Sequence, residues 1–333
     1  MSQQSPFPPP AQSRVRYLHD LLTVQPHGND PQTGEELFIG PIAAQHQHRV
    51  FGGQVLAQGV MACTQTVHPE RPLHSIHAYF LRPGDSKQPI TFGVDRLRDG
   101  RSFSARRANA YQNGKPILSM LASFQTPADG YDHQINMPDD LPQPEDLDSV
   151  SDQLGHINHP VAQEWAWERP FDIRHIDPPL WLYSAKERNN SNAVWLRTPA
   201  AFAVPDAMHK AALAYASDYT VLEPVLRQHG VHWTRPEMAV ASLDHAMWWH
   251  RPAPVDDWLL YISESPSAQG ARGLGLGHFF TREGVLIATV GQEGMLRVPD
   301  TFRTRVKQLA QDAVIRSANW RKPRSRWGGR NRS

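Results

Sequence analysis

One acidic residue closes a long apolar run in the second half of the chain. Residues 208–220 (MHKAALAYASDYT) read as a helix with almost no polar face, and this helix ends at Asp218. A helix that is apolar all round is normally buried, and its C-terminal end disfavours an anion by about 0.3–1 kcal/mol. Both effects raise the pKa of a carboxyl group, which suits a general base that works near neutral pH. The alternative is an Asp that points into solvent and starts a turn.

Two polar residues on expected strands are further candidates. Gln292 continues a row of alternate residues, Leu286, Ala288 and Val290, that share one strand face. A buried amide there must find hydrogen-bond partners, so it is either a functional group or a structural one that satisfies backbone groups. Ser242 begins the strand after the apolar helix, and its hydroxyl can both donate and accept. Most serines at strand starts are solvated or cap a turn, so Ser242 alone is a weak signal.

Motifs for other chemistries are missing from the sequence. It contains no Gly-x-Ser-x-Gly, His-Glu-x-x-His or Cys-x-x-Cys. His245 follows Ser242 by three residues, which places the two on opposite faces of a strand. The glycines in residues 273–277 lead into a strand rather than a helix, so we expect no dinucleotide site. His46 and His48 could share a strand face but lack further ligands, so we expect no metal.

Composition narrows the class of protein. The net charge of +1 over 333 residues gives no argument for binding nucleic acid or an anionic membrane. The single cysteine, Cys63, lies in an apolar run, so we expect a buried, inert thiol and a reducing, cytoplasmic location. No apolar run reaches the roughly 18 residues of a membrane-spanning helix, and the N-terminus lacks a signal-peptide pattern. The arginine-rich tail after Asp312 is expected to be solvated, with a nucleic-acid or phosphate contact as the less expected alternative.

The expected elements form two similar halves. The first half has a helix at 51–67, opened by two glycines, and strands at 74–81, 90–97, 102–111 and 116–125. The second has strands at 171–176 and 193–197, the apolar helix, and strands at 239–250, 257–265, 273–281 and 285–298. A short helix or strand is expected at 15–23. Asp-Gly and Asn-Gly pairs at 99–100 and 113–114 indicate tight hairpins.

The two halves are an internal repeat. HSIHAYFLRP at 74–83 aligns with LDHAMWWHRP at 243–252, and Gln125 aligns with Gln292. A repeat this long indicates a duplicated domain, and pairing the two sheets edge to edge removes two open edges. Only the second helix carries an acid, Asp218, so we expect one site per chain. The retention of Gln125 without a matching acid favours the structural interpretation of Gln292.

These residues resemble a known family. The first half is similar to type II acyl-CoA thioesterases in FGGQV at 51–55, HAYFLRPGD at 77–85, LRDGRSFSARR at 97–107, NGKPI at 113–117 and ASFQ at 122–125. The second half is similar in ASD at 216–218, SLDH at 242–245, HRP at 250–252 and QEG at 292–294. The resemblance spans about residues 15–298. It implies an α+β double hotdog, in which two tandem copies of a helix are each wrapped by a curved antiparallel β-sheet.

The resemblance also implies a function. The family hydrolyses fatty acyl-CoA thioesters to free fatty acid and CoA without metal or cofactor, and its catalytic positions fall on Asp218, Ser242 and Gln292. Many members carry Thr where this chain has Ser242. The expected mechanism is attack by a water that Asp218 deprotonates while Ser242 and Gln292 hold it. CoA phosphates would meet surface Arg or Lys side chains, with Arg101, Arg106 and Arg107 as candidates.

Domain boundaries follow from the same alignment. We expect a disordered N-terminus at 1–13, an N-terminal hotdog at 14–125, a linker at 126–170, a C-terminal hotdog with the catalytic residues at 171–300, and a helix with a basic tail at 301–333. A homo-oligomer, a dimer or tetramer, is expected from exposed sheet edges and from the family. The alternatives are another hotdog activity, such as enoyl-CoA hydration, or a non-catalytic acyl-CoA-binding module.

Overall fold

The computed structural model describes most of the chain. The described residues are 10–42, 49–157, 160–181 and 187–299, with six more between 303 and 310. The N-terminus was expected to be disordered at 1–13; residues 1–9 of it lie outside the described residues, as do the pair His46 and His48 and the basic tail from residue 311. Residues 11–13 are helical, so the expected disorder is wrong there. Among those that are described, no helix combines the length and apolar character needed to cross a bilayer.

The first half contains the predicted helix and its four strands. Its elements are α1 (Ala11–Leu22), β1 (Gln25–Asn29), β2 (Glu36–Gly40), α2 (Gly52–Thr64), β3 (Leu73–Phe80), β4 (Ile90–Asp99), β5 (Phe103–Gln112) and β6 (Lys115–Gln125). The segment expected at 15–23 is helical and belongs to α1. Strands β1 and β2 were not predicted. The sequence of β1, QPHGN, is exposed throughout and has no apolar alternation, so only its backbone pairing with β2 makes it a strand.

The second half repeats this order with additions. Its elements are β7 (Asp172–His175), β8 (Ser191–Arg197), α5 (Asp206–Ser217), α6 (Glu223–His229), β9 (Ala239–Ser242), β10 (Asp244–Trp249), β11 (Leu259–Gln269), β12 (Arg272–Thr281) and β13 (Leu286–Arg297). Helix α6 was not predicted, and it ends at Gly230 in the left-handed conformation. The single strand expected at 239–250 is wrong, because the chain forms two strands there.

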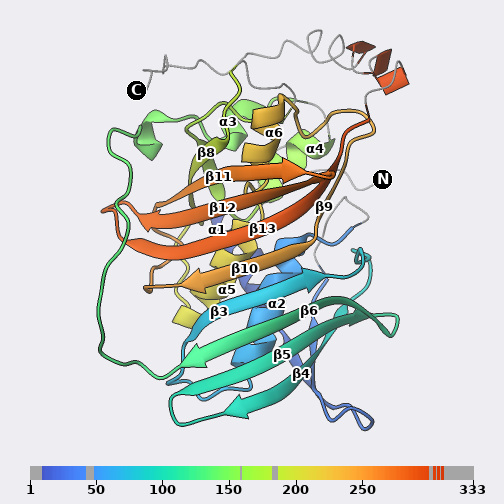
Figure 1. Cartoon of the computed structure of the whole chain (residues 1–333), viewed down its shortest axis with the longest axis vertical. Helices are drawn as coiled ribbons and strands as arrows, with labels where there is room; N and C mark the ends of the chain where they lie inside the picture. Colours follow the sequence, from blue (N-terminus) through green and yellow to red (C-terminus); the bar gives the residue numbers. More distant parts are fainter. Residues whose placement is uncertain are drawn as a thin grey trace.

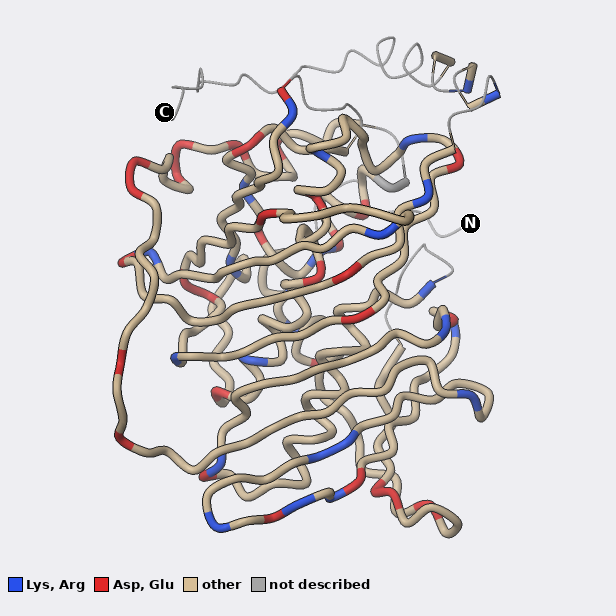
Figure 2. Tube along the Cα trace, in the orientation of Figure 1, with Lys and Arg blue, Asp and Glu red and all other residues tan. Residues whose placement is uncertain are grey.

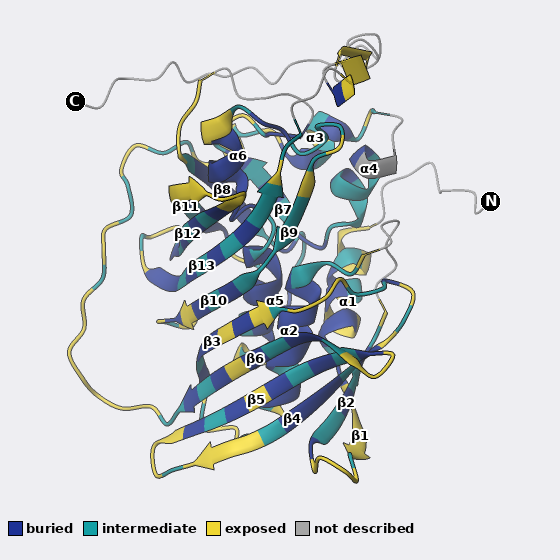
Figure 3. Ribbon diagram, turned by 45° about the vertical axis from the view of Figure 1, so that its right-hand side comes forward, coloured by how far each residue is buried: buried dark blue, intermediate teal, exposed yellow. Residues whose placement is uncertain are grey.

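Short helices lie between the two halves. They are η1 (Pro144–Asp146), α3 (Val150–Leu154), α4 (Pro160–Gln163) and η2 (Glu164–Glu168). Before them, the chain that leaves β6 runs along the outside of the molecule, where residues 127–133 are exposed (Figures 1 and 3).

One antiparallel sheet runs through both halves (Figure 1). Its strand order is β1-β2-β4-β5-β6-β3-β10-β13-β12-β11-β8-β7, with β9 paired to β13. The halves meet where β3 pairs with β10, for example at His77 opposite Ala246. This edge-to-edge junction, predicted from the repeat, gives both β3 and β10 a partner on each side.

Helices α2 and α5 lie next to each other against the sheet, and α1 packs on both (Figures 1 and 3). Their close approach depends on Gly53. A Cβ atom at Gly53 would lie 2.4 Å from the backbone oxygen of Tyr215 and 2.5 Å from the ring of Phe51. Such distances are far below van der Waals contact, so only glycine allows α2 to approach α5 here.

Most charged side chains lie at the periphery of this arrangement, although a few, such as Arg106 and Glu223, are buried. Arginines gather on β4 and β5 near the edge of the first half, next to acidic residues (Figure 2). Arg96 and Arg107 are paired there with Glu36 and Asp95. The interior formed by the helices and the inner face of the sheet is therefore mostly apolar, and a polar group placed in it needs specific partners.

Candidate active site

Asp218 lies directly after the last residue of α5, as predicted. It is the C-terminal cap of the helix, with φ −81° and ψ −4°, and its side chain is partly buried. The N-terminal end of α2 faces it from the other half of the chain. The backbone N–H of Gly53 donates to Asp218 Oδ2 at 2.9 Å. The positive end of the α2 dipole therefore offsets the unfavourable negative end of α5.

The other two predicted residues converge on the same carboxylate. Gln292, fully buried on β13, donates from Nε2 to Asp218 Oδ1 at 2.8 Å and to Ser242 Oγ at 2.9 Å. The Ser242 hydroxyl donates to Asp218 Oδ1 over 3.4 Å. Ser242 is the last residue of β9, where it lies opposite Gly294. The structure thus brings all three sequence-predicted side chains together around one carboxylate.

Burial changes the acidity of this group. Loss of water contact raises the pKa of Asp218 to about 6, while the hydrogen bonds from Gln292, Gly53 and Ser242 lower it in part. The carboxylate is therefore mostly ionised at neutral pH, yet basic enough to accept a proton. This is the behaviour expected of Asp218 from its place at the end of an apolar helix.

The glycine pair that opens α2 lets the helix backbone lie directly against the carboxylate. A Cβ atom on Gly52 would lie 2.7 Å from Asp218 Oδ2 and 3.1 Å from the ring of Phe80. The sequence predicted a close backbone approach at these glycines but did not show that the approaching group is Asp218. Phe51, just before them, stacks on Tyr219 with ring centroids 5.1 Å apart. Aromatic side chains therefore lie near the carboxylate.

The prediction that His245 lies on the opposite strand face from Ser242 is wrong. Residues 242 and 246 pair with residues 294 and 291 of β13, so four steps along one strand oppose three along the other. The extra residue is a β-bulge at Leu243, which inverts the alternation of side chains. As a result, His245 reaches the same amide as Ser242: its Nδ1 lies 2.5 Å from Gln292 Oε1.

Ser217 also belongs to this network and was not predicted. Its Oγ lies 3.1 Å from Nε2 of His245, and its backbone oxygen accepts a hydrogen bond from Tyr261 at 3.1 Å. The run ASD at 216–218 and the run SLDH at 242–245 contain both residues. Period-two counting could not find the contact, because the bulge is invisible in the sequence.

Two of the arginines proposed to meet phosphate groups are already engaged. Arg106 is 1% exposed and bonds Thr66 and Asp99, so its selection as a surface phosphate contact is wrong. Arg107 pairs with Asp95 at 2.7 Å, whereas Arg101 is exposed.

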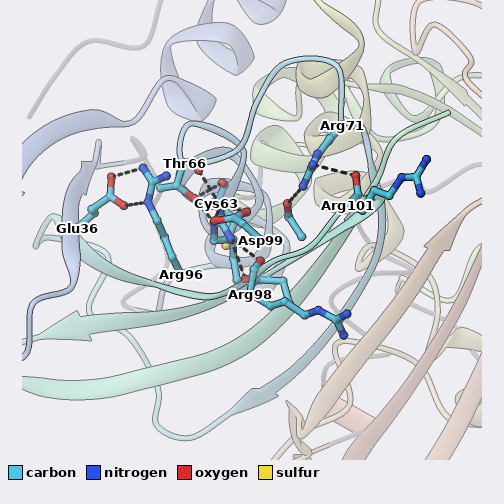
Figure 4. Close-up of polar contacts among 11 residues, drawn as sticks. Glu36, Cys63, Thr66, Arg71, Arg96, Arg98, Asp99 and Arg101 are labelled. Atoms are coloured by element: carbon cyan, nitrogen blue, oxygen red, sulfur yellow. Dashed lines mark hydrogen bonds and ion pairs between the residues drawn. The ribbon is translucent and has the colours of Figure 1, made fainter.

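An open cavity of about 460 Å³ lies over Arg106, lined also by Arg71 and Arg96. Arg96 is paired with Glu36, and Arg71 donates to the backbone oxygen of Arg101 at 3.1 Å (Figure 4). Most of the positive charge in this cavity therefore has a partner within the chain.

Metal and thiol chemistry have no site in the described part of the chain. No group of three His, Cys, Asp or Glu side chains that could hold a metal ion occurs there. Cys63 is fully buried on α2, and burial raises the pKa of its thiol to about 12. The predicted burial of this thiol is confirmed, and at neutral pH it is not a nucleophile.

Comparison with known families identifies similar sequences in both halves. A sequence model described as acyl-CoA thioesterase matches residues 177–295, and one described as acyl-CoA thioesterase N-terminal domain matches residues 41–125. The chain is 38% identical over 255 residues to acyl-CoA thioesterase 2 of Haemophilus influenzae, covering 75% of this chain and 88% of that protein. It is 35% identical over 304 residues to acyl-coenzyme A thioesterase 8 of Homo sapiens, covering 87% and 92%.

Solved structures agree. The acyl-CoA thioesterase II TesB2 of Mycobacterium marinum superimposes with a TM-score of 0.68 at 36% identity, covering 85% of this chain and 99% of that one. A protein of unknown function with a hot dog fold from Alicyclobacillus acidocaldarius gives 0.67 at 18% identity, covering 85% and 98%. At 18% identity, the second match supports the fold alone. The predicted double hotdog fold is confirmed.

Proposed function

Because the chain belongs to the type II acyl-CoA thioesterase family, and is thus an acyl-CoA thioester hydrolase, we propose that it works by direct attack of water, with Asp218 as the general base. The observation that carries this proposal is the convergence of Gln292 and Ser242 on Asp218 Oδ1, at 2.8 and 3.4 Å. A carboxylate held between a hydroxyl and an amide can bind and orient one water molecule.

The reaction balances with these groups alone. The water oxygen attacks the thioester carbonyl carbon while its proton passes to Asp218. The tetrahedral intermediate then collapses, the C–S bond breaks, CoA leaves as the thiolate, and Asp218 releases its proton to solvent before the next turnover. A thiolate is a weak base near neutral pH, so its departure needs no dedicated acid. The products are the free acid and CoA.

The raised pKa of Asp218 suits this role. A base is most effective when its pKa lies near the working pH, and burial brings the pKa of Asp218 to about 6. The Gln292 amide and the Gly53 N–H stabilise the ionised form and keep the pKa from rising further. We therefore expect kcat/KM to rise with pH through about 6 and then level off.

The aromatic rings near the carboxylate suit an apolar acyl group. Phe51, Phe80 and Tyr219 place apolar surface next to Asp218 and the start of α2. We expect a fatty acyl chain to lie along these rings, with the thioester carbonyl at Asp218. The preferred chain length would be read from kcat/KM over a series of acyl-CoAs.

Enoyl-CoA hydration is not favoured by this geometry. That reaction usually needs a paired Asp and His, whereas the described contacts of the His245 ring nitrogens are to Gln292 and Ser217. Release of free thiol from acyl-CoA, followed with a thiol reagent, tests the proposal. A hydratase gives no thiol, and a binding module gives saturable binding without turnover.

A homo-oligomer also remains a proposal. Tyr79, Leu121 and Trp248 are 63%, 52% and 37% exposed on the adjacent strands β3, β6 and β10. Large apolar side chains gathered on one sheet face are typical of interaction surfaces. Sedimentation analysis at micromolar concentration should therefore give a dimer or tetramer, and a monomer would contradict the proposal. The cytoplasmic location stays a prediction that cell fractionation would test.

A further inference from the structure

A buried histidine stands directly behind the proposed site. His245, on β10, is 0% exposed. Its Nδ1 lies 2.5 Å from Gln292 Oε1, and its Nε2 lies 3.1 Å from Ser217 Oγ. The other end of the same amide, Gln292 Nε2, faces Asp218 and Ser242. The histidine therefore contacts the proposed water-binding groups only through Gln292.

The contact with Gln292 fixes where the histidine must carry its proton. A carbonyl oxygen can only accept, so Nδ1 of His245 has to be the N–H donor. Burial lowers the pKa of His245 to about 4, so the ring is neutral at pH 7 and has a single N–H. Nε2 then carries a lone pair that faces the Ser217 hydroxyl at 3.1 Å. That hydroxyl also lies 2.8 Å from the backbone oxygen of Ala214, and it has one proton for the two acceptors.

The opposite tautomer would disturb the site. With its proton on Nε2, the ring would present a lone pair to Gln292, and the amide would have to turn over. Gln292 Oε1 would then face the Asp218 carboxylate at the position where Nε2 now donates at 2.8 Å. Two oxygens at that distance repel each other unless Asp218 is protonated, and a protonated Asp218 cannot act as a base.

We propose that His245, neutral and protonated on Nδ1, is a positioning residue that holds the Gln292 amide with its N–H groups toward Asp218 and Ser242. This inference rests on the proposed function for its kinetic consequence, but the protonated nitrogen can be observed without any turnover. Other groups near the ring do not compete for this role. Tyr261, on β11, donates to the Ser217 backbone, and Asp218 reaches the ring only through Gln292.

The repeat supports the assignment from the other half of the chain. The residue that aligns with His245 is Ile76, since 245 − 76 equals the 169 residues that separate Pro83 from Pro252. Isoleucine has no hydrogen-bonding side chain. The first half keeps Gln125 but lacks both the acid and the histidine, so the histidine occurs only where an amide has a carboxylate to face.

Nitrogen NMR of the protein labelled with ¹⁵N-histidine tests the tautomer directly. The signals of His245, one of 17 histidines, are assigned from their loss in His245→Asn. At pH 7 we expect a protonated Nδ1 and an unprotonated Nε2. A proton on Nε2 alone, or on both nitrogens, would overturn the proposal.

Kinetics test the consequence for Asp218. His245→Leu removes the donor, and we expect kcat/KM to fall about 10- to 100-fold, as is usual when a residue that orients a functional group is lost. The acidic limb of the pH profile should also move to higher pH, because the Gln292 bond that lowers the pKa of Asp218 is weakened. An unchanged limb would show that the residue is merely structural.

Two amide variants add a specific check. The side-chain nitrogen of Asn can occupy the place of Nδ1, whereas that of Gln reaches the place of Nε2. His245→Asn should therefore recover more activity than His245→Gln, and the reverse order would contradict the proposal.

His175→Leu is the matched control. His175 is also buried, and burial lowers its pKa to about 3, but it makes no contact with Asp218 or Gln292. Its loss should leave the acidic limb in place.

Failure of this inference can be told from failure of the proposed function. If Asp218→Asn retains turnover, the proposed function fails whatever the tautomer of His245. If Asp218→Asn is inactive but the NMR shows the other tautomer, only the role of His245 falls.

Discussion

Replacing Asp218 with Asn tests two properties of this residue, its role in turnover and its effect on the stability of the fold. The substitution keeps the shape of the side chain but removes both the charge and the proton acceptor. Since a positioned general base contributes about 10²- to 10⁴-fold to rate, we expect kcat/KM for thiol release to fall by that factor. The remaining activity should lose its dependence on a group with a pKa of about 6.

The same change should remove a pH-dependent loss of stability. The pKa of Asp218 rises from 3.8 to about 6 on folding, so the folded state binds the proton more tightly than the unfolded state. The contribution of Asp218 to stability is then fully present below pH 3.8 and is lost as the pH rises through about 6. Above that pH the free energy of unfolding is lower by about 3 kcal/mol. Asn carries no charge and escapes this loss. Its amide N–H₂ must face either the Gly53 N–H or Gln292, which costs about 1–3 kcal/mol at every pH.

The change of stability with pH therefore tests the raised pKa more directly than stability at a single pH, because the cost of the amide is the same at every pH. Between pH 5 and pH 8, the free energy of unfolding of Asp218→Asn relative to wild type should grow by about 1–1.5 kcal/mol. Urea denaturation at both pH values, followed by the fluorescence of the ten tryptophans, measures this difference. Asp206→Asn is a matched control, since Asp206 lies at the other end of α5 and pairs with Lys210. It should leave kcat/KM unchanged.

Two results would refute the reasoning about Asp218. Turnover within tenfold of wild type in Asp218→Asn would remove it as the base. A relative stability that does not change between pH 5 and pH 8 would show that its carboxylate is not held at a raised pKa. Either result would leave the fold intact and the mechanism without its central group.

Substitutions at three further positions have defined outcomes. Ser242→Thr keeps the hydroxyl and should retain kcat/KM within a few-fold, whereas Ser242→Ala should lose about tenfold or more, as one hydrogen bond to the reacting groups disappears; thiol release measures both. Gly53→Ala places a Cβ 2.4 Å from the backbone oxygen of Tyr215 and should cost about 1–3 kcal/mol in urea denaturation. Burial raises the pKa of Glu223 from 4.5 to about 7, so its stability contribution is lost as the pH rises through that window. Glu223→Gln, which still accepts from Trp233, should therefore raise Tm more at pH 8 than at pH 5.

Each of these expectations has a contrary result. Equal loss in both Ser242 variants would mean that the hydroxyl is not what matters there. Wild-type stability of Gly53→Ala would mean that α2 and α5 can move apart freely. A Tm gain for Glu223→Gln that is the same at both pH values would mean that the burial of Glu223 has not altered its acidity.

The fold was largely predictable because its main elements have strong local signals. Helices α2 and α5 have almost no polar face. The strands show alternating apolar and polar residues and are separated by turns that contain glycine. Strand β1 and helix α6 have no such signal. The sequence of α6, EPVLRQH, buries Glu223 and Arg227, and no periodicity predicts that charged side chains will be covered by the surrounding structure.

The site was predictable only in part. Asp218 could be found from its helix and Gln292 from its strand face, whereas Ser242 was a weak signal; the resemblance to a family gave all three a catalytic role. The N–H of Gly53 lies 165 residues from Asp218 in sequence, so no local pattern connects the two. His245 was placed on the wrong face because one extra residue in the strand reverses every side chain after it.

The exposed chain after β6 has a practical consequence when it is considered together with the bond from Gly53 to Asp218. A proteolytic nick within residues 127–131 would cut no strand or helix. The two fragments would stay joined by the β3–β10 seam and by the helix pair. The proposed catalytic side chains all lie in the second fragment, but Gly53, whose N–H bonds Asp218, lies in the first. Thiol release by separately expressed pieces would therefore report their reassembly, as in a split-enzyme sensor.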